Sequence, residues 1–258
     1  VLAPGLVEGS CPSEADRTEF RECNSKHCPA DLRCTAAQDV VLLLDGGGSA
    51  MPADRATPKR HYFDAQKAFA EELIRHSLLT NTSAAHSAAE EDANAGRGAR
   101  FGLVVFGGAE LPRVASLLSG DAQELSRQLY HAVMPAGQTS VAQALHAAAR
   151  VFQLSVPAVT DVDGLMSPRH KTVLLITDGQ ALRPGSFVPA ARELRAAGTR
   201  VAVALVRTDD SLGFDGAATA LCEVASWPCA DHVFKVKRWE DLKDQYGRFL
   251  AALCPASE

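Results

Sequence analysis

The sequence lacks a long apolar run, a basic stripe and any cysteine in its middle. No apolar run approaches the roughly 18 residues that a helix needs to cross a bilayer, so we expect no membrane span in this chain. The 26 Lys and Arg residues stand against 31 Asp and Glu residues, which gives a formal charge of −5, and no row of basic residues is interleaved with aromatic ones. Nucleic acid is therefore not expected as a partner.

The cysteines lie only near the two ends of the chain. They are Cys11, Cys23, Cys28, Cys34, Cys222, Cys229 and Cys254. A catalytic or metal-binding cluster would more often draw on the middle as well, whereas this distribution suits disulfides in an oxidising compartment. Because their number is odd, at least one has no partner in this chain. The chain also begins at Val1 with neither a Met nor a leader-like segment, so we expect it to be processed or part of a longer protein.

The sequence also lacks the signatures of nucleotide binding and of serine hydrolysis. No Lys follows the run Gly46 to Gly48, and no third glycine stands at dinucleotide spacing, so a phosphate cradle is not favoured. Ser49 is not part of a Gly-x-Ser-x-Gly elbow and has no evident Ser-His-Asp arrangement around it. The eight histidines are scattered, with no pair at ligand spacing beside the acidic positions described below. We therefore expect no enzyme activity.

The 258 residues, 47% hydrophobic, allow one large domain or two smaller ones, and we expect one main domain with a small appendage. From Asp39 onward, continuous apolar runs alternate with amphipathic segments. This alternation predicts an α/β fold with a doubly wound, mostly parallel central sheet flanked by helices. The predicted strands are 40–44, 101–106, 172–177, 201–206 and 232–236, and the predicted helices are 63–79, 122–133, 139–154, 188–197, 217–225 and 239–253.

Residues 81–97 are rich in Ala, Ser, Asn and Gly, which predicts a surface loop. The triplet Asn81-Thr82-Ser83 within it fits a glycosylation acceptor. Asn81 is therefore a candidate glycosylation site, in agreement with an extracellular setting.

Two predicted strands end in a carboxylate followed by glycine, at Asp45 and Asp178. Ligands of such sheets sit beyond the carboxyl ends of the strands. Two neighbouring carboxylates repel each other unless a cation lies between them. Ser49 and Thr139 can add hydroxyl oxygens, and no His or Cys stands beside them, so the pattern favours Mg²⁺ or Mn²⁺ over zinc.

Simpler roles for these residues stay open. Asp45 and Asp178 could be turn or helix-capping residues, for which Asp-Gly is common. Thr139 could be a helix N-cap, a role that is compatible with metal ligation.

Three stretches together resemble a known family. Asp45 to Ser49, Gly137 to Thr139 and Thr177 to Gly179 look like the metal-ion-dependent adhesion site of a von Willebrand factor A domain, and the resemblance spans about residues 38–253. It implies a domain over 34–254 with a tail at 255–258, and a cation held by Asp45, Ser49, Thr139 and Asp178. A carboxylate of the bound partner would complete the metal shell.

One position departs from the family pattern. The first motif of the family is Asp-x-Ser-x-Ser, and Gly47 replaces its middle serine, so one hydroxyl ligand is lost. Water can fill that place, since Mg²⁺ readily keeps several waters. The site is expected either to bind the cation more weakly or to be vestigial.

The first 33 residues carry a second resemblance. Arg21 to Pro29, with Cys11 upstream, looks like the closing third of a thrombospondin type 1 repeat. Cys11, Cys23 and Cys28 would then pair upstream of this chain or stay unpaired within it. The two resemblances leave Cys34 to pair with Cys254, because both ends of the A-domain fold lie close together, and Cys222 to pair with Cys229.

The resemblances imply a secreted protein or the ectodomain of a larger surface protein. We expect an extracellular adhesion or matrix module that engages a protein or glycan partner through an acidic group. One alternative is a structural subunit of an extracellular assembly with a metal-free site, which Gly47 favours. A metal-dependent secreted hydrolase is the other, but no general base is evident.

Overall fold

A single six-stranded sheet forms the centre of the computed structural model, which describes residues 37–47, 60–82, 98–107, 111–135, 140–155, 169–179, 185–206 and 214–253. The strand order is β3-β2-β1-β4-β5-β6. Only the β2–β3 pair is antiparallel among the neighbouring strands of this sheet, which confirms the mostly parallel architecture. The strands are β1 (Gln38–Asp45), β2 (Ala99–Phe106), β3 (Arg113–Ser119), β4 (His170–Thr177), β5 (Arg200–Val206) and β6 (Val233–Val236).

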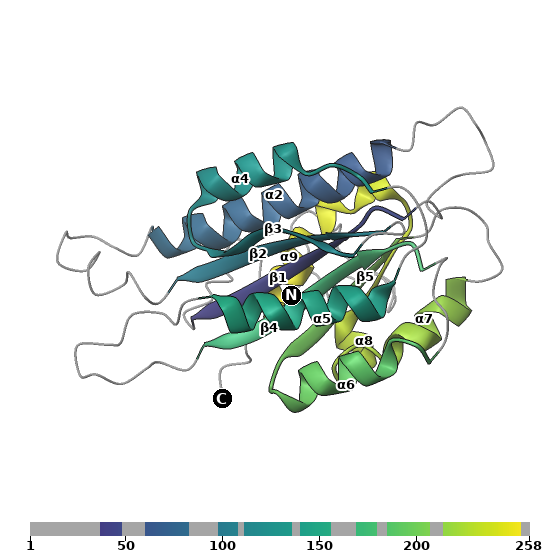
Figure 1. Cartoon of the computed structure of the whole chain (residues 1–258). Helices are drawn as coiled ribbons and strands as arrows, with labels where there is room; N and C mark the ends of the chain where they lie inside the picture. Colours follow the sequence, from purple (N-terminus) through teal and green to yellow (C-terminus); the bar gives the residue numbers. More distant parts are fainter. Residues whose placement is uncertain are drawn as a thin grey trace, which may run out of the picture.

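Helices cover both faces of the sheet, as Figure 1 shows. Helices α2 and α4 lie over one face together with α9, and α5, α6 and α7 lie over the other. No helix in the described ranges is both long and apolar enough to cross a membrane. The helical elements are α2 (Arg60–Thr82), α4 (Ala122–His131), α5 (Val141–Leu154), α6 (Val188–Ala196), α7 (Phe214–Cys222), α8 (Cys229–His232), η3 (Trp239–Asp241), η4 (Lys243–Gln245) and α9 (Tyr246–Leu253).

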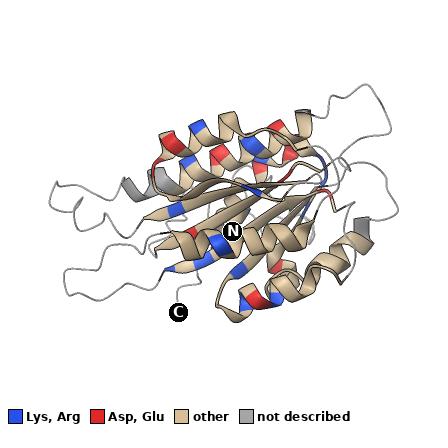
Figure 2. Ribbon diagram, viewed as in Figure 1, with Lys and Arg blue, Asp and Glu red and all other residues tan. Residues whose placement is uncertain are grey.

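Strand β1 lies in the middle of the sheet and is buried along its whole length. Successive side chains of a strand point to opposite faces. Val40, Leu42 and Leu44 accordingly pack under α2 and α9, whereas Val41 and Leu43 pack under α5 and α6. Charged residues lie mainly on the helices and near the ends of the strands (Figure 2). The continuous apolar runs of the sequence therefore form the centre of two cores.

Strand β3 was not predicted. It is an edge strand whose residues are half-buried or exposed, and it joins the sheet only through β2. The signal used for the other strands was an uninterrupted apolar run, which is typical of strands buried on both faces. The segment Arg113–Ser119 has no such run, because an edge strand can face solvent.

Several helix predictions were wrong in their extent, among them 217–225, where the structure has α7 at Phe214–Cys222. Helix α2 continues to Thr82, so Asn81 lies in its last turn and not in a surface loop. The segment 239–253 is not one helix but two 3₁₀ turns followed by α9. Trp239 and Leu242 are both buried three residues apart, a spacing that puts two side chains on one face of a 3₁₀ turn.

The predicted helix 139–154 begins later than expected. Its N-cap is Ser140, whose hydroxyl accepts a hydrogen bond from the Gln143 amide. The alternative role of Thr139 as N-cap is therefore wrong, and Thr139 itself lies outside the described residues.

Cys222 and Cys229 form a disulfide between the end of α7 and the start of α8, with their Cα atoms 5.2 Å apart. The described residues include no other cysteine. The pairing of Cys34 with Cys254, and the assignments of Cys11, Cys23 and Cys28, fall outside them.

Candidate functional site

The carboxyl ends of β1 and β4 bring the two sequence-predicted aspartates to one edge of the sheet. The strands are parallel neighbours, with Leu44 in register with Ile176, so the next residues, Asp45 and Thr177, face each other. Asp178 follows directly. Asp45 and Asp178 each expose only 6% of their surface. Two buried aspartates thus follow each other at the carboxyl ends of adjacent parallel strands.

The carboxylate of Asp45 is oriented by two hydrogen bonds. The Thr177 hydroxyl donates to its Oδ2 atom at 2.7 Å, and the Gly47 amide donates to its Oδ1 atom at 2.8 Å. The amide of Gly179 in turn donates to the Thr177 hydroxyl at 3.1 Å. Thr177 was missed as a site residue. Its place immediately before Asp178, at the end of a buried strand, is the signal that could have found it.

The backbone of Asp45 is held by a side chain from α2. The Asp45 amide donates to Gln66 Oε1 at 2.8 Å, and Gln66 Nε2 donates to the Asp45 carbonyl at 2.7 Å. Gln66 is 1% exposed, so this pair of bonds lies in the core. Sequence reasoning also missed Gln66, because a single Gln in an amphipathic helix carries no sign of its partner.

The glycines that follow Asp45 pack tightly against neighbouring loops. The Gly46 amide donates to the Phe106 carbonyl at 2.7 Å, and a Cβ atom at Gly46 would come within 2.4 Å of the Pro135 ring. Gly107 adopts φ +134°, and a Cβ there would lie 2.7 Å from the Gly47 nitrogen. Close backbone approach accounts for Gly46 and Gly107. The end of β1 is therefore held by the neighbouring loops as well as by Gln66 of α2.

The donors present suit a hard cation. Asp45 and Asp178 supply carboxylate oxygens, the ligands that Mg²⁺ and Mn²⁺ prefer. Within the described ranges, no three His, Cys, Asp or Glu residues gather in a way that could hold a metal. Ser49 and Thr139, the expected hydroxyl ligands, fall outside these ranges.

Comparison with known sequences gives one match to a family. The sequence model of the von Willebrand factor type A domain matches residues 39–248. A search of curated proteins gives no match.

Comparison with solved structures shows the same fold elsewhere. Proximal thread matrix protein 1 from the mussel byssus superimposes with a TM-score of 0.62 and 20% identity, over 86% of this chain and 49% of that one. A further structure of the mussel protein, with zinc in its MIDAS motif, has the same TM-score and coverage. The VWA domain of SpRpn10 gives a TM-score of 0.53 and 12% identity, over 81% of this chain and 95% of that one. This chain thus spans about half the length of the mussel protein.

Proposed function

The chain belongs to the von Willebrand factor type A domain family, and we propose that it is an extracellular adhesion or matrix module that holds its partner through a divalent cation. The observation that carries this proposal is the pair of buried carboxylates, Asp45 and Asp178, at the ends of adjacent parallel strands. The hydroxyl of Thr177 holds the Asp45 carboxylate in one orientation.

Asp45, Asp178, Ser49 and Thr139 would hold Mg²⁺ or Mn²⁺. The cation would supply positive charge that removes the repulsion between the two carboxylates and attracts a third from a protein or glycan partner. The role proposed for the chain is binding, which needs no general base or nucleophile, and not catalysis.

An extracellular setting is supported by two observations. The Cys222–Cys229 disulfide is of a kind that persists in oxidising compartments. The fold is shared with a matrix protein of the mussel byssus.

In this setting, residues 1–33 would be the end of a thrombospondin type 1 repeat, Cys34 would pair with Cys254, and Asn81 would carry a glycan.

Attachment of the full chain to a decellularised matrix preparation tests the proposal. We expect attachment in Mg²⁺ buffer that is lost with chelator and in Asp45→Asn. Thr172→Val serves as a matched control, because Thr172 lies on the same strand β4 as Thr177 and away from the site. Attachment that persists in Asp45→Asn would contradict the proposal.

A second function is favoured by Gly47, which removes one hydroxyl from the family pattern. The chain would then be a structural subunit of an extracellular assembly that packs against its neighbours without a metal. Attachment or assembly that is equal with and without chelator would support this second function against the first.

A further inference from the structure

A groove of about 900 Å³ lies near the amino ends of the parallel strands, whereas Asp45 lies at their carboxyl ends. It is lined by the start of β5 at Arg200, the end of α6 at Arg195, the α7–α8 loop, and α9 at Arg248. The strands are parallel, so the start of β5 and the end of β1 lie on opposite edges. The groove is therefore separate from the candidate cation site.

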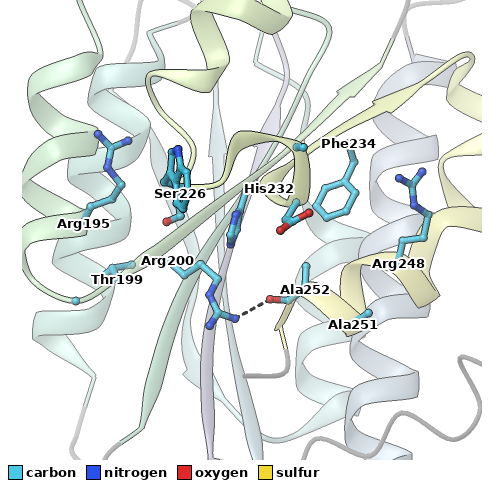
Figure 3. A pocket seen from close by; sticks show the side chains of 13 residues that line it. Arg195, Thr199, Arg200, Ser226, His232, Phe234, Arg248, Ala251 and Ala252 are labelled. Carbon is cyan, nitrogen blue, oxygen red and sulfur yellow. Dashed lines mark hydrogen bonds between the residues drawn. The ribbon is translucent and has the colours of Figure 1, made fainter. Parts of the chain in front are cut away.

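The groove is positively charged, although the chain as a whole is not. Its lining contains three guanidinium groups, those of Arg195, Arg200 and Arg248, and one carboxylate, that of Asp231. With His232 neutral, this amounts to a formal +2, in a chain whose net charge is −5. Figure 3 shows Arg195 and Arg248 on opposite sides, with Arg200 and His232 between them. An acidic occupant fits this distribution.

Two of the three guanidinium groups are held in place by helix ends. Arg195 Nη1 donates to the carbonyls of residues 223, 224 and 225 at 2.7, 2.6 and 2.9 Å. Arg200 Nη1 donates to the Ala252 carbonyl at 2.7 Å and to the Leu253 carbonyl at 3.3 Å. A guanidinium has five N–H donors. Within the described part of the chain, these bonds use only Nη1, so Nε and Nη2 can meet a carboxylate without loss of the fixed geometry.

Arg248 completes the charged rim and lies over Phe234, which is only 5% exposed. Its guanidinium lies 5.5 Å from the centre of the Phe234 ring. Ala251 and Ala252 line the same side of the groove. The groove thus combines a charged rim with apolar surface.

Trp227 stands at the edge of this groove with 90% of its surface exposed. Its loop is closed by the Cys222–Cys229 disulfide. Ser226 adds two bonds to β5, from its amide to the Val201 carbonyl at 2.8 Å and from the Val201 amide to its hydroxyl at 3.0 Å. A large aromatic side chain on a well-held loop loses little conformational entropy on binding, and Trp is enriched among residues that dominate binding energy.

We propose that this groove binds an acidic peptide segment of a partner protein. Asp or Glu side chains of the segment would meet Arg195, Arg200 and Arg248, and an apolar side chain would pack on Trp227. Guanidinium forks match the two oxygens of a carboxylate. Guanidinium groups beside an exposed Trp suit a segment that carries both acidic and apolar side chains. Binding here requires no cation, so it goes beyond the function proposed above.

Selection of peptides from a displayed library of random 12-residue sequences, on the full chain in chelator, tests this proposal. We expect the enriched peptides to carry several Asp or Glu residues and at least one apolar residue. Their affinity should fall at least tenfold in Trp227→Ala and in Arg248→Glu. Both side chains are exposed, so the thermal midpoint of each variant should match that of the original chain.

Matched controls lie on α4. Tyr130→Ala removes an aromatic side chain that is 79% exposed, and Arg127→Glu reverses a charge on a side chain that is 66% exposed. Both should leave peptide affinity unchanged. Enrichment of neutral or basic peptides, or equal affinity for Trp227→Ala, would overturn the proposal. So would heparin binding that is lost in Arg248→Glu when no acidic peptide is enriched. Because chelator is present throughout, a negative result at the cation site would leave this test intact.

Discussion

At the scale of single residues, the Thr177 hydroxyl is the side-chain donor that reaches the Asp45 carboxylate from the neighbouring strand. Thr177→Val keeps the shape of the side chain but removes one donor to Asp45 and one acceptor for the Gly179 amide. Because both Thr177 and Asp45 are buried, we expect the free energy of unfolding to fall by about 1–3 kcal/mol. Urea denaturation measures this change.

Thr172 gives the matched control on the same strand. Its hydroxyl is also buried, but it has no hydrogen-bond partner among the described residues. Thr172→Val should therefore leave the free energy of unfolding unchanged or raise it slightly. Equal losses in the two variants would show that the Thr177 hydroxyl has no special role in holding Asp45.

Glu72 on α2 forms a local charge cluster with Arg75 and His76. The hydrogen bond from Arg75 holds the pKa of Glu72 below its ordinary value of 4.5, partial burial opposes this shift, and the bond with His76 adds to it. Arg75→Gln should therefore raise the pKa of Glu72, as followed by NMR titration of its carboxyl carbon.

The sign of the effect on stability follows from this lowered pKa. The stabilisation from Glu72 is present above its unfolded-state pKa and is lost as the pH falls through the lower folded-state value. Stability should accordingly fall more on acidification in the original chain than in Arg75→Gln. Identical pH dependence of unfolding in both proteins would contradict this assignment.

At the scale of elements, an ion cluster joins three strands at the amino ends of the parallel strands, opposite to the candidate cation site. The Asp39 carboxylate on β1 accepts from Arg100 on β2 at 2.9 and 2.8 Å and from Arg169, next to β4, at 2.7 Å. Arg169 also donates to the carbonyls of Gln38 and Gly98. The side chain of Asp39 is 4% exposed and that of Arg169 is 7% exposed, so the cluster is shielded from water.

The two arginines should differ in their contribution. Arg169→Met should lower the free energy of unfolding by about 3 kcal/mol, because a buried pair loses one partner and two carbonyls lose a donor. Arg100→Met should cost less, since the Arg100 side chain is 20% exposed and water can take its place. Denaturant titration of both variants gives the comparison, and a larger loss for Arg100→Met would contradict it.

The elements also show what a sequence can predict. Strands β1, β4 and β5 were predicted to within two residues because both of their faces are buried, which requires continuous apolar runs. Strand β3 was missed because it needs no such run. The place of Asp45 and Asp178 at neighbouring strand ends was predicted because strand ends can be located from the runs, whereas the contact of Gln66 was not, since its partner is 21 residues away along the chain. Contacts between elements, in contrast to the elements themselves, leave no local pattern.

At the scale of the whole molecule, the two ends of the parallel strands differ in the charge of the ligand that they suit. The edge at Asp45 and Asp178 carries buried carboxylates and suits a cation, whereas the edge at Arg200 carries guanidinium groups and suits an acidic segment. The intervening strands are apolar and buried. One module of this kind could join two partners, one through a metal and one without it.

Calorimetric titration of Mg²⁺ and Mn²⁺ into the chelator-treated full chain tests the central claim, that the carboxyl edge of the sheet binds a divalent cation. We predict saturable binding to a single site that is lost in Asp45→Ala and in Asp178→Asn and retained in Thr172→Val. Absence of binding in the original chain, or equal binding in Asp45→Ala, would contradict the account and favour a structural role without a metal.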